Sequence, residues 1–295
     1  MKRAACVGSG RGVTFVPDRL VNALDLDDVP GVVAPYAMED FVAAAVLVER
    51  LAVEGFFDGG GELAILDPGR EFSPAIATNM ERALQDAADI FDPLIITDKV
   101  DTQAQIDRLV GRLVSEGVDR VIYFDDAPTM SGVVRAMVAQ KFTPPLGLVA
   151  NAQSNSVIST LNYPARQVYA VSTVGAYPTT NGTRTSLPDY DVTKECLTAK
   201  DVDTLGLDGP RISVVLEACD MLALINTVID ADGTKPTTAS FYDGLAKVSN
   251  FESAYGTTLD FSLNRIGATQ VWDLRGDPIC RCLKVVSRSH SVSID

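Results

Sequence analysis

Short apolar runs alternate with amphipathic stretches along the middle of the chain. Runs such as Leu63–Leu66 and Val121–Phe124 are continuously apolar, which is typical of strands buried on both faces of a sheet. Between the runs, apolar residues recur at i, i+3 and i+4 spacing, as in Thr102–Glu116, which predicts helices. The strands recur at intervals of roughly 25–30 residues, the rhythm of βαβ units. The pattern therefore predicts a mostly parallel sheet covered by helices on both faces.

The expected elements follow from this periodicity. We expect strands at residues 63–66, 94–96, 121–124, 146–149 and 168–171, and helices at residues 38–54, 74–87, 102–116, 128–141, 212–228 and 238–248.

The flanking parts of the chain are less regular. The first 35 residues lack clear periodicity, and residues 175–210 are rich in Thr, Pro, Gly and Asp, which predicts loops with a short helix at 192–197. Apolar residues alternate between 257 and 286, which predicts antiparallel strands. The longest apolar stretches are about ten residues long, so we expect no membrane-spanning helix.

The composition is that of a folded globular protein, with 46% apolar and 22% charged residues. Asp and Glu number 39 against 25 Lys and Arg, a net charge of −14. This acidity argues against nucleic acid, which needs a basic face, and against an anionic membrane surface. Gly8, Gly10 and Gly12 interrupt any apolar run at the start, so we expect no signal sequence in this chain.

Motifs for nucleotide binding and nucleophilic catalysis are missing from the sequence. The stretch GSGRGV at 8–13 reads G-x-G-x-G, which differs from the dinucleotide fingerprint and predicts a turn. There is no G-x-S-x-G, and the single histidine, His290, lies in a Ser-rich tail, which argues against a Ser-His or Cys-His enzyme. We therefore expect no catalytic residues and no cofactor.

An acidic pair, Asp125 and Asp126, directly follows a predicted strand. One hypothesis is a metal-dependent α/β enzyme in which these carboxylates hold a divalent ion, as in phosphoryl-transfer sites. The simpler interpretation is a charge pair that interacts favourably with the N-terminus of the helix starting at Pro128. A third hypothesis is a ligand-sensing domain of a receptor.

The five cysteines do not have zinc-site spacing. Cys280 and Cys282 form a C-x-C without a second pair, and an odd number of cysteines leaves at least one thiol free. Cys196 and Cys219 flank a turn-rich segment and can be bridged in an oxidising compartment.

Small-molecule binding has better support from the loops of the predicted sheet. In open parallel sheets, ligands bind beyond the carboxyl ends of the strands. The corresponding loops, at 67–73, 125–129, 150–155 and 173–177, carry hydroxyls, amides, aromatic rings and carboxylates. These groups are suited to orienting a small polar solute.

Three segments resemble the type I periplasmic-binding-protein family, the leucine-binding-protein-like solute receptors of branched-chain amino-acid ABC transporters. They are ELAILDPGREFSPAIATNMERAL from residue 62, the stretch from IITDKVDTQAQ to TPPLGLVA at 95–150, and ACDMLALINTVIDADGTKPTTASFYDGL from residue 218. The resemblance covers about residues 38–285.

The resemblance implies a two-lobed α/β fold of periplasmic-binding-protein type I, here with one complete parallel-sheet lobe and a partial second lobe. Residues 1–57 are then a remnant of the first lobe and 58–206 the complete second lobe. Residues 207–268 are the return segment of the first lobe, and 269–295 a hinge crossing with C-terminal strands. The family's βαβ units ahead of residue 38 are missing, so we expect an N-terminally truncated chain with half a cleft and weak solute binding.

The resemblance also implies a function. It predicts a solute-binding protein of an ABC importer that binds an amino acid or similar small polar solute between two lobes. The partner is then a membrane permease, the full-length protein is periplasmic or extracellular, and the chain is a monomer without catalysis.

Candidate ligand-binding residues are carried over by their place in the family's pattern. Glu71 or Phe72 matches the aromatic position after the lobe's first strand, Asp125 or Asp126 a contact after the third, and Asn151 one after the fourth. Secreted members commonly contain a disulfide, for which Cys196–Cys219 is the candidate. Cys280 or Cys282 is then expected to pair with a cysteine in the missing part.

Overall fold

A computed structural model of the 295-residue chain divides into two compact units. Unit 1 comprises Met1–Asp40, Thr173–Val271 and Ser289–Asp295, and unit 2 comprises Phe41–Ser172 and Trp272–Arg288. The structure describes residues 13–15, 20–21, 31–67, 74–90, 92–97, 99–124, 127–150, 154–175, 179–181, 184–186, 189–199, 209–232, 237–263 and 265–292.

The core of unit 2 is one sheet in which the described strands follow the order β15-β14-β9-β8-β7-β5-β6. The strands from β6 to β9 are parallel, whereas β14 is antiparallel to β9 and β15 is antiparallel to β14. The bounds are β5 Glu62–Leu66, β6 Leu94–Ile96, β7 Val118–Tyr123, β8 Leu146–Val149, β9 Val168–Ser172, β14 Gln270–Asp277 and β15 Cys282–Val285. The predicted, mostly parallel α/β sheet is therefore confirmed.

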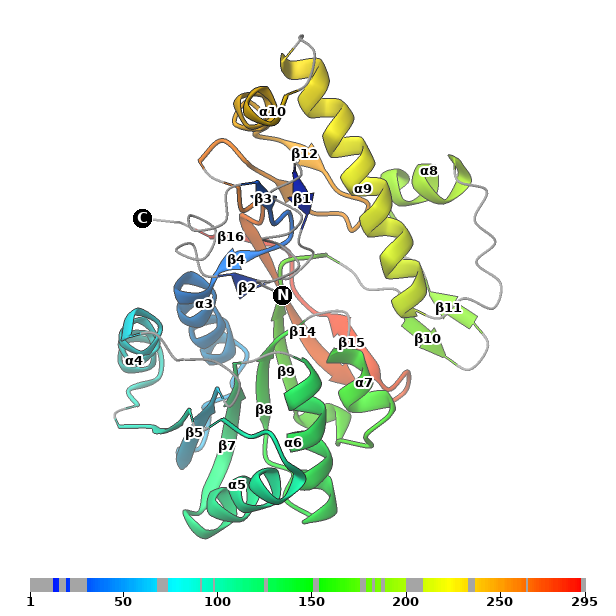
Figure 1. Cartoon of the computed structure of the whole chain (residues 1–295). Helices are drawn as coiled ribbons and strands as arrows, with labels where there is room; N and C mark the ends of the chain where they lie inside the picture. Colours follow the sequence, from blue (N-terminus) through cyan, green and yellow to red (C-terminus); the bar gives the residue numbers. More distant parts are fainter. Residues whose placement is uncertain are drawn as a thin grey trace. The chain divides into compact units, whose positions relative to one another are not determined.

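Helices cover the sheet of unit 2, and α5, α6 and α7 pack next to one another in chain order (Figure 1). The chain crosses the sheet in one direction through β6, β7, β8 and β9, and in the opposite direction from β5 to β6. Because βαβ crossovers are right-handed, α5, α6 and α7 lie on one face of the sheet and α4 lies on the other. The bounds are α3 Asp40–Val53, α4 Pro74–Ala88, α5 Gln103–Ser115, α6 Ala127–Ala139 and α7 Ser154–Ser159, with a 3-10 turn η1 at Ala165–Gln167.

The apolar runs of unit 2 are buried as their pattern predicts. Ile65, Leu66 and Ile122 are fully buried, and each such side chain stabilises the fold by about 1.5–3 kcal/mol. Gly147 on β8 lets the end of α3 approach, because a Cβ at this position would lie 2.6 Å from a methyl group of Leu51. The C-terminal end of α3 is therefore part of the cover of this sheet.

Unit 1 contains the long helix α9 and strands that, in its described part, pair in two-stranded sheets. Its elements agree with the expected partial second lobe. β1 pairs with β3, β2 with β4, β10 with β11 and β12 with β13, and β16 pairs with the first two residues of β14. The bounds are β1 Thr14–Phe15, β2 Leu20–Val21, β3 Val32–Val33, β4 Met38–Glu39, β10 Thr179–Asn181, β11 Arg184–Ser186, α8 Asp191–Ala199, α9 Gly209–Asp232, α10 Thr238–Leu245, β12 Phe251–Glu252, β13 Thr258–Leu259 and β16 His290–Ser291.

The boundaries between the two compact units lie earlier in the chain than the expected lobe boundaries at 57/58 and 206/207. The changes fall at Asp40/Phe41 and Ser172/Thr173. At the first, α3 is included in unit 2 because it packs on the sheet. At the second, α8 is included in unit 1 because a disulfide between Cys196 and Cys219 joins it to α9.

Two expectations about local structure differ from the structure. The segment 175–210 was expected to be loops and a short helix, yet it also contains the hairpin β10–β11, for which the dipeptide Asn181-Gly182 is a sequence signal. The expectation that Cys280 or Cys282 pairs with a cysteine outside this chain is wrong, because the two form a disulfide with each other.

One helix also differs from the expectation that no helix is long and apolar enough to span a membrane. Residues 211–231 of α9 are long and apolar enough to cross a membrane, judged by these two criteria alone. The same helix has a buried stripe at Leu216, Leu224 and Val228, and between them the buried carboxylate of Asp220. An apolar helix with a hydrogen-bonded acid on its buried face is typical of the core of a folded domain.

Candidate functional site

In unit 2, the direction in which successive parallel strands are added to the sheet reverses between β5 and β7. Counted along the chain, the order β6-β5-β7-β8-β9 is 2-1-3-4-5, so the connections leaving β5 and β7 diverge to opposite sides. Such a topological switch point leaves a crevice at the carboxyl ends of the two strands, and ligands of open α/β sheets bind there. The backbone N–H of Phe124 donates to the carbonyl of Leu66 at 2.8 Å, so both strands end at the same level.

The described residues at this carboxyl edge are buried and partly polar. Asp67 directly follows β5 and is fully buried, and its backbone N–H donates to the carbonyl of Ile96 at the end of β6, at 3.0 Å. Ser172 ends β9, and Ser154 begins α7 after β8; both are fully buried. A carboxylate and two hydroxyls therefore lie at the ends of strands that are otherwise apolar, which is the composition of a polar ligand site.

The candidate ligand-binding residues follow, in the sequence, the strands that end at this edge. Glu71, Phe72, Asp125, Asp126 and Asn151 are all outside the described residues. Asp125 is the next residue in the sequence after Phe124, and Asn151 the next after Ala150. The five assignments stay predictions.

A pocket of about 400 Å³ lies beside the carboxyl end of β6. Its lining includes Ile96 together with three cationic side chains, Lys99, Arg108 and Arg112. Positive charge here contrasts with the net charge of −14 of the whole chain. Among the described residues, no group of three His, Cys, Asp or Glu side chains could hold a metal ion.

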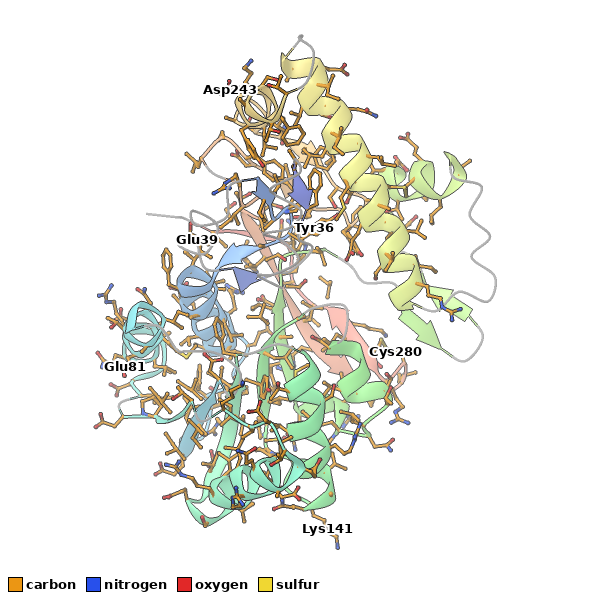
Figure 2. The ribbon with its side chains drawn as sticks, viewed as in Figure 1. Tyr36, Glu39, Glu81, Lys141, Asp243 and Cys280 are labelled. Atoms are coloured by element: carbon orange, nitrogen blue, oxygen red, sulfur yellow. A yellow bond between two sulfur atoms is a disulfide. The ribbon has the colours of Figure 1, made fainter. Side chains whose placement is uncertain are left out.

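Unit 1 contains a buried polar cluster, the Asp220 cluster, which we define as Tyr36, Asp220, Ser253, Ala254 and Tyr255. The Asp220 carboxylate accepts from the Tyr36 hydroxyl at 2.6 Å, the Ser253 hydroxyl at 2.6 Å and the backbone N–H of Ala254 at 2.7 Å. The rings of Tyr36 and Tyr255 meet edge to face, with centroids 5.4 Å apart. Figure 2 shows Tyr36, the residue through which the N-terminal segment joins this cluster.

Burial controls the electrostatics of the Asp220 cluster. It raises the pKa of Asp220 above the usual carboxyl value, although the hydrogen bonds from Ser253, Tyr36 and Ala254 oppose the shift. Burial, followed by the neighbouring Asp220 charge, raises the pKa of Tyr36 as well. The cluster also reaches the chain crossing at Ser172/Thr173, because the Thr173 hydroxyl donates to the Tyr36 carbonyl at 2.7 Å.

Sequence patterns did not predict the Asp220 cluster. The available signal was the position of Asp220 in the stripe Leu216, Asp220 and Leu224, where i, i+4 spacing places an acid on a buried helix face. The partners, Tyr36 and Ser253, lie in segments without periodicity and more than 30 residues away along the chain, at separations of 184 and 33. Only the tertiary structure brings them together.

No family model matches the sequence, and no curated protein matches it. Solved structures of solute-binding proteins do match the fold. A solute-binding protein of an ABC transporter from Rhodopseudomonas palustris HaA2, in complex with p-hydroxybenzoic acid, has a TM-score of 0.73 and 14% identity, over 99% of this chain and 75% of that one.

Two further solved structures are similar to the chain. A branched-chain amino acid ABC transporter protein from Thermus thermophilus with bound valine has a TM-score of 0.66 and 11% identity, over 98% of this chain and 75% of that one. A fatty acid ABC transporter substrate-binding protein from Thermomonospora curvata has a TM-score of 0.66 and 13% identity, over 89% of this chain and 65% of that one. At these identities the likeness establishes the fold, and the predicted periplasmic-binding-protein type I fold is confirmed.

Proposed function

We propose that this protein is the solute-binding component of an ABC importer and binds an amino acid or a similar small polar solute. The fold is that of transport solute-binding proteins, whose solved relatives are described with p-hydroxybenzoic acid, valine and fatty acid as ligands or transported solutes. The observation that carries the proposal is the buried polar edge at the β5/β7 switch point, where the buried Asp67 directly follows β5.

The chemistry of the loops at this edge supports a polar ligand. We propose that Asp125 or Asp126 accepts a hydrogen bond or pairs with the solute's ammonium group, and that the amide of Asn151 both donates and accepts. Phe72 would cover the apolar part of the solute, and Glu71 is the alternative at that position. The partner in transport is a membrane permease, and the expected location is periplasmic or extracellular. No catalytic step is required.

Calorimetric titration tests the proposal with leucine, valine, p-hydroxybenzoate and a medium-chain fatty acid. We expect saturable binding of at least one amino acid, with a Kd of about a micromolar or weaker. Asp125→Ala and Asn151→Ala are expected to weaken this binding by about tenfold each, since a hydrogen bond to a charged group contributes about 1.5–3 kcal/mol.

The matched control is Glu116→Ala, because Glu116 is exposed and precedes β7 at the opposite edge of the same sheet. It should bind solute like the wild type. A protein that binds none of the four solutes, or edge variants that bind as tightly as the control, would contradict the proposal.

A further inference from the structure

The hairpin β14–β15 contains a disulfide between residues two positions apart. Cys280 and Cys282 are bridged across Arg281, with their Cα atoms 5.3 Å apart. Figure 2 labels Cys280, which lies in the turn between the two strands. Two residues at i and i+2 of an extended strand are about 6.6 Å or more apart. Here Arg281 has a left-handed backbone (φ 51°), which shortens the span and directs the two sulfurs toward each other.

The hairpin does not depend on this disulfide. Its ladder pairs four residues of β14 with four of β15, ending at Asp277 and Cys282. The Asp277 carboxylate accepts from the backbone N–H of Ile279 at 2.6 Å and of Cys280 at 3.2 Å, and it pairs with Lys284 at 2.6 Å. None of these bonds involves a sulfur atom, so we expect the turn to keep them when the disulfide opens.

The other disulfide of the chain is different in kind. Cys196–Cys219 joins α8 to α9 over 23 residues, in unit 1. A cross-link over a long segment removes much more entropy from the unfolded chain than one over two residues. At equilibrium with thiols, Cys280–Cys282 therefore opens at a lower ratio of thiol to disulfide than Cys196–Cys219.

The two sulfurs of the hairpin differ in access. Cys282 is buried, with 6% of its surface exposed, whereas Cys280 is half-buried between Asp277 and the exposed Arg281. Ile279, next to Cys280, is 87% exposed. An incoming thiolate therefore reaches the sulfur of Cys280 and displaces that of Cys282, because exchange depends on which sulfur is accessible.

We propose that Cys280–Cys282 is a thiol–disulfide exchange site that reacts with a dithiol reductant. A thiolate of the reductant attacks Sγ of Cys280, the Cys280–Cys282 bond breaks, and Cys282 leaves as a thiolate. The second thiolate of the reductant then attacks the reductant sulfur that is bonded to Sγ of Cys280. This closes a disulfide within the reductant and releases the Cys280 thiolate. Two electrons pass from the dithiol to the protein, the reductant becomes a disulfide, and each cysteine takes up one proton from solvent.

The site gives this chain a redox chemistry that the proposed solute binding does not need. Its opening frees Arg281 from the constraint on its backbone, while the Arg281 guanidinium still donates to the carbonyl of Ile158 at 3.2 Å and to Asn162. The structural change is thus confined to the turn, and the sheet of unit 2 is retained in both redox states.

Equilibration of the wild-type protein in dithiothreitol buffers of graded redox ratio, followed by alkylation and peptide mapping, tests the proposal. Peptide mapping also separates the thiol of Cys6 from the others. We expect the Cys280–Cys282 pair to be half reduced at a dithiol-to-disulfide ratio about tenfold or more below that needed for Cys196–Cys219. Reduction of both pairs at the same ratio, or alkylation of Cys280 and Cys282 in untreated protein, would overturn it.

Two single variants test the direction of attack. Cys282→Ser leaves the accessible thiol of Cys280, and Cys280→Ser leaves the buried thiol of Cys282. We expect the first variant to react with an aromatic disulfide reagent about tenfold faster than the second. Equal rates, or a faster Cys280→Ser variant, would contradict attack at Cys280.

Discussion

The two units of the chain are stabilised by different kinds of interaction. In unit 2 apolar residues such as Ile65 and Ile122 are fully buried in the sheet, and the buried Asp273 carboxylate is paired with the Arg50 guanidinium at 2.7 Å. In unit 1 the buried Asp220 carboxylate accepts hydrogen bonds from uncharged groups, and a disulfide over 23 residues joins α8 to α9, whereas the disulfide of unit 2 spans two residues. Hydrophobic burial is insensitive to pH and to thiols, whereas a buried acid with a raised pKa responds to pH and a disulfide responds to thiols. We therefore expect the stability of unit 1 to depend on pH through Asp220.

The largest expected effect is a cavity in the core of unit 2. Ile65→Ala is expected to lower the free energy of unfolding by about 2–5 kcal/mol, because the fully buried Ile65 side chain is replaced by a void between α-helical and strand neighbours. Trp272, the single tryptophan, belongs to unit 2 and is 7% exposed, so its fluorescence in urea reports this unit.

The cost of Ile65→Ala should depend neither on pH nor on thiols, because only apolar contacts are lost. The loss should be equal at pH 5 and pH 7 and unchanged by a reductant, within about 0.5 kcal/mol. Val114→Ala, at a 51% exposed position on α5, is the control and should change stability by less than about 0.5 kcal/mol. A cost for Ile65→Ala no larger than that of the control would show that burial does not stabilise unit 2.

A smaller effect is expected at the buried acid of unit 1. Because the pKa of Asp220 is raised in the folded state, its protonated form is favoured there. The resulting stabilisation is complete below the ordinary carboxyl value of about 4 and is lost as the pH rises through the raised value. The free energy of unfolding of Asp220→Asn relative to the wild type should therefore rise as the pH increases above about 4.

Urea unfolding followed by circular dichroism at a series of pH values measures this difference. Asp230→Asn is the matched control, because Asp230 is an exposed acid on the same helix, α9. The control should follow the wild type at every pH. If Asp220→Asn follows it too, burial of the carboxylate has no energetic consequence and the contrast between the units fails.

The two units also differ in how much of each could be predicted from the sequence. In unit 2 the expected strand 146–149 and helix 102–116 match β8 and α5, because local periodicity and side-chain burial agree there. The capping residue Thr102 and the glycine Gly117 (φ 72°) mark both ends of that helix. The parallel order followed from the rhythm of the elements.

The candidate site could be predicted only to the level of the sheet edge. The rule that ligands bind at the carboxyl ends of parallel strands needs the parallel direction, which the βαβ rhythm implies, and it leads to the loops after β5, β7 and β8. The strand order, and with it the switch point, comes from the structure. In unit 1 the contact between Tyr36 and Asp220 joins residues 184 positions apart. No local pattern encodes such a pair, because the i, i+4 spacing indicates the buried helix face of Asp220 but not its distant partner.

The smallest expected effect tests a feature that both units share. Thr102 caps α5 in unit 2, and its hydroxyl accepts from the N–H of Gln105 at 3.3 Å. Thr237 caps α10 in unit 1, and its hydroxyl accepts from the N–H of Ser240 at 3.1 Å. Both bonds are exposed and local, so Thr102→Ala and Thr237→Ala should each lower stability by about 1 kcal/mol.

Thr227→Ala is the control for these cap variants. Thr227 is an exposed threonine inside α9 whose hydroxyl donates to the carbonyl of Ala223, so its removal should change stability by only a few tenths of a kcal/mol. Thermal unfolding of the three variants measures the costs. Equal costs at the two caps mean that the units are alike in local structure and differ only in what their interiors bury. A cap cost in unit 1 of more than about twice that in unit 2 would place the difference in the helix ends instead.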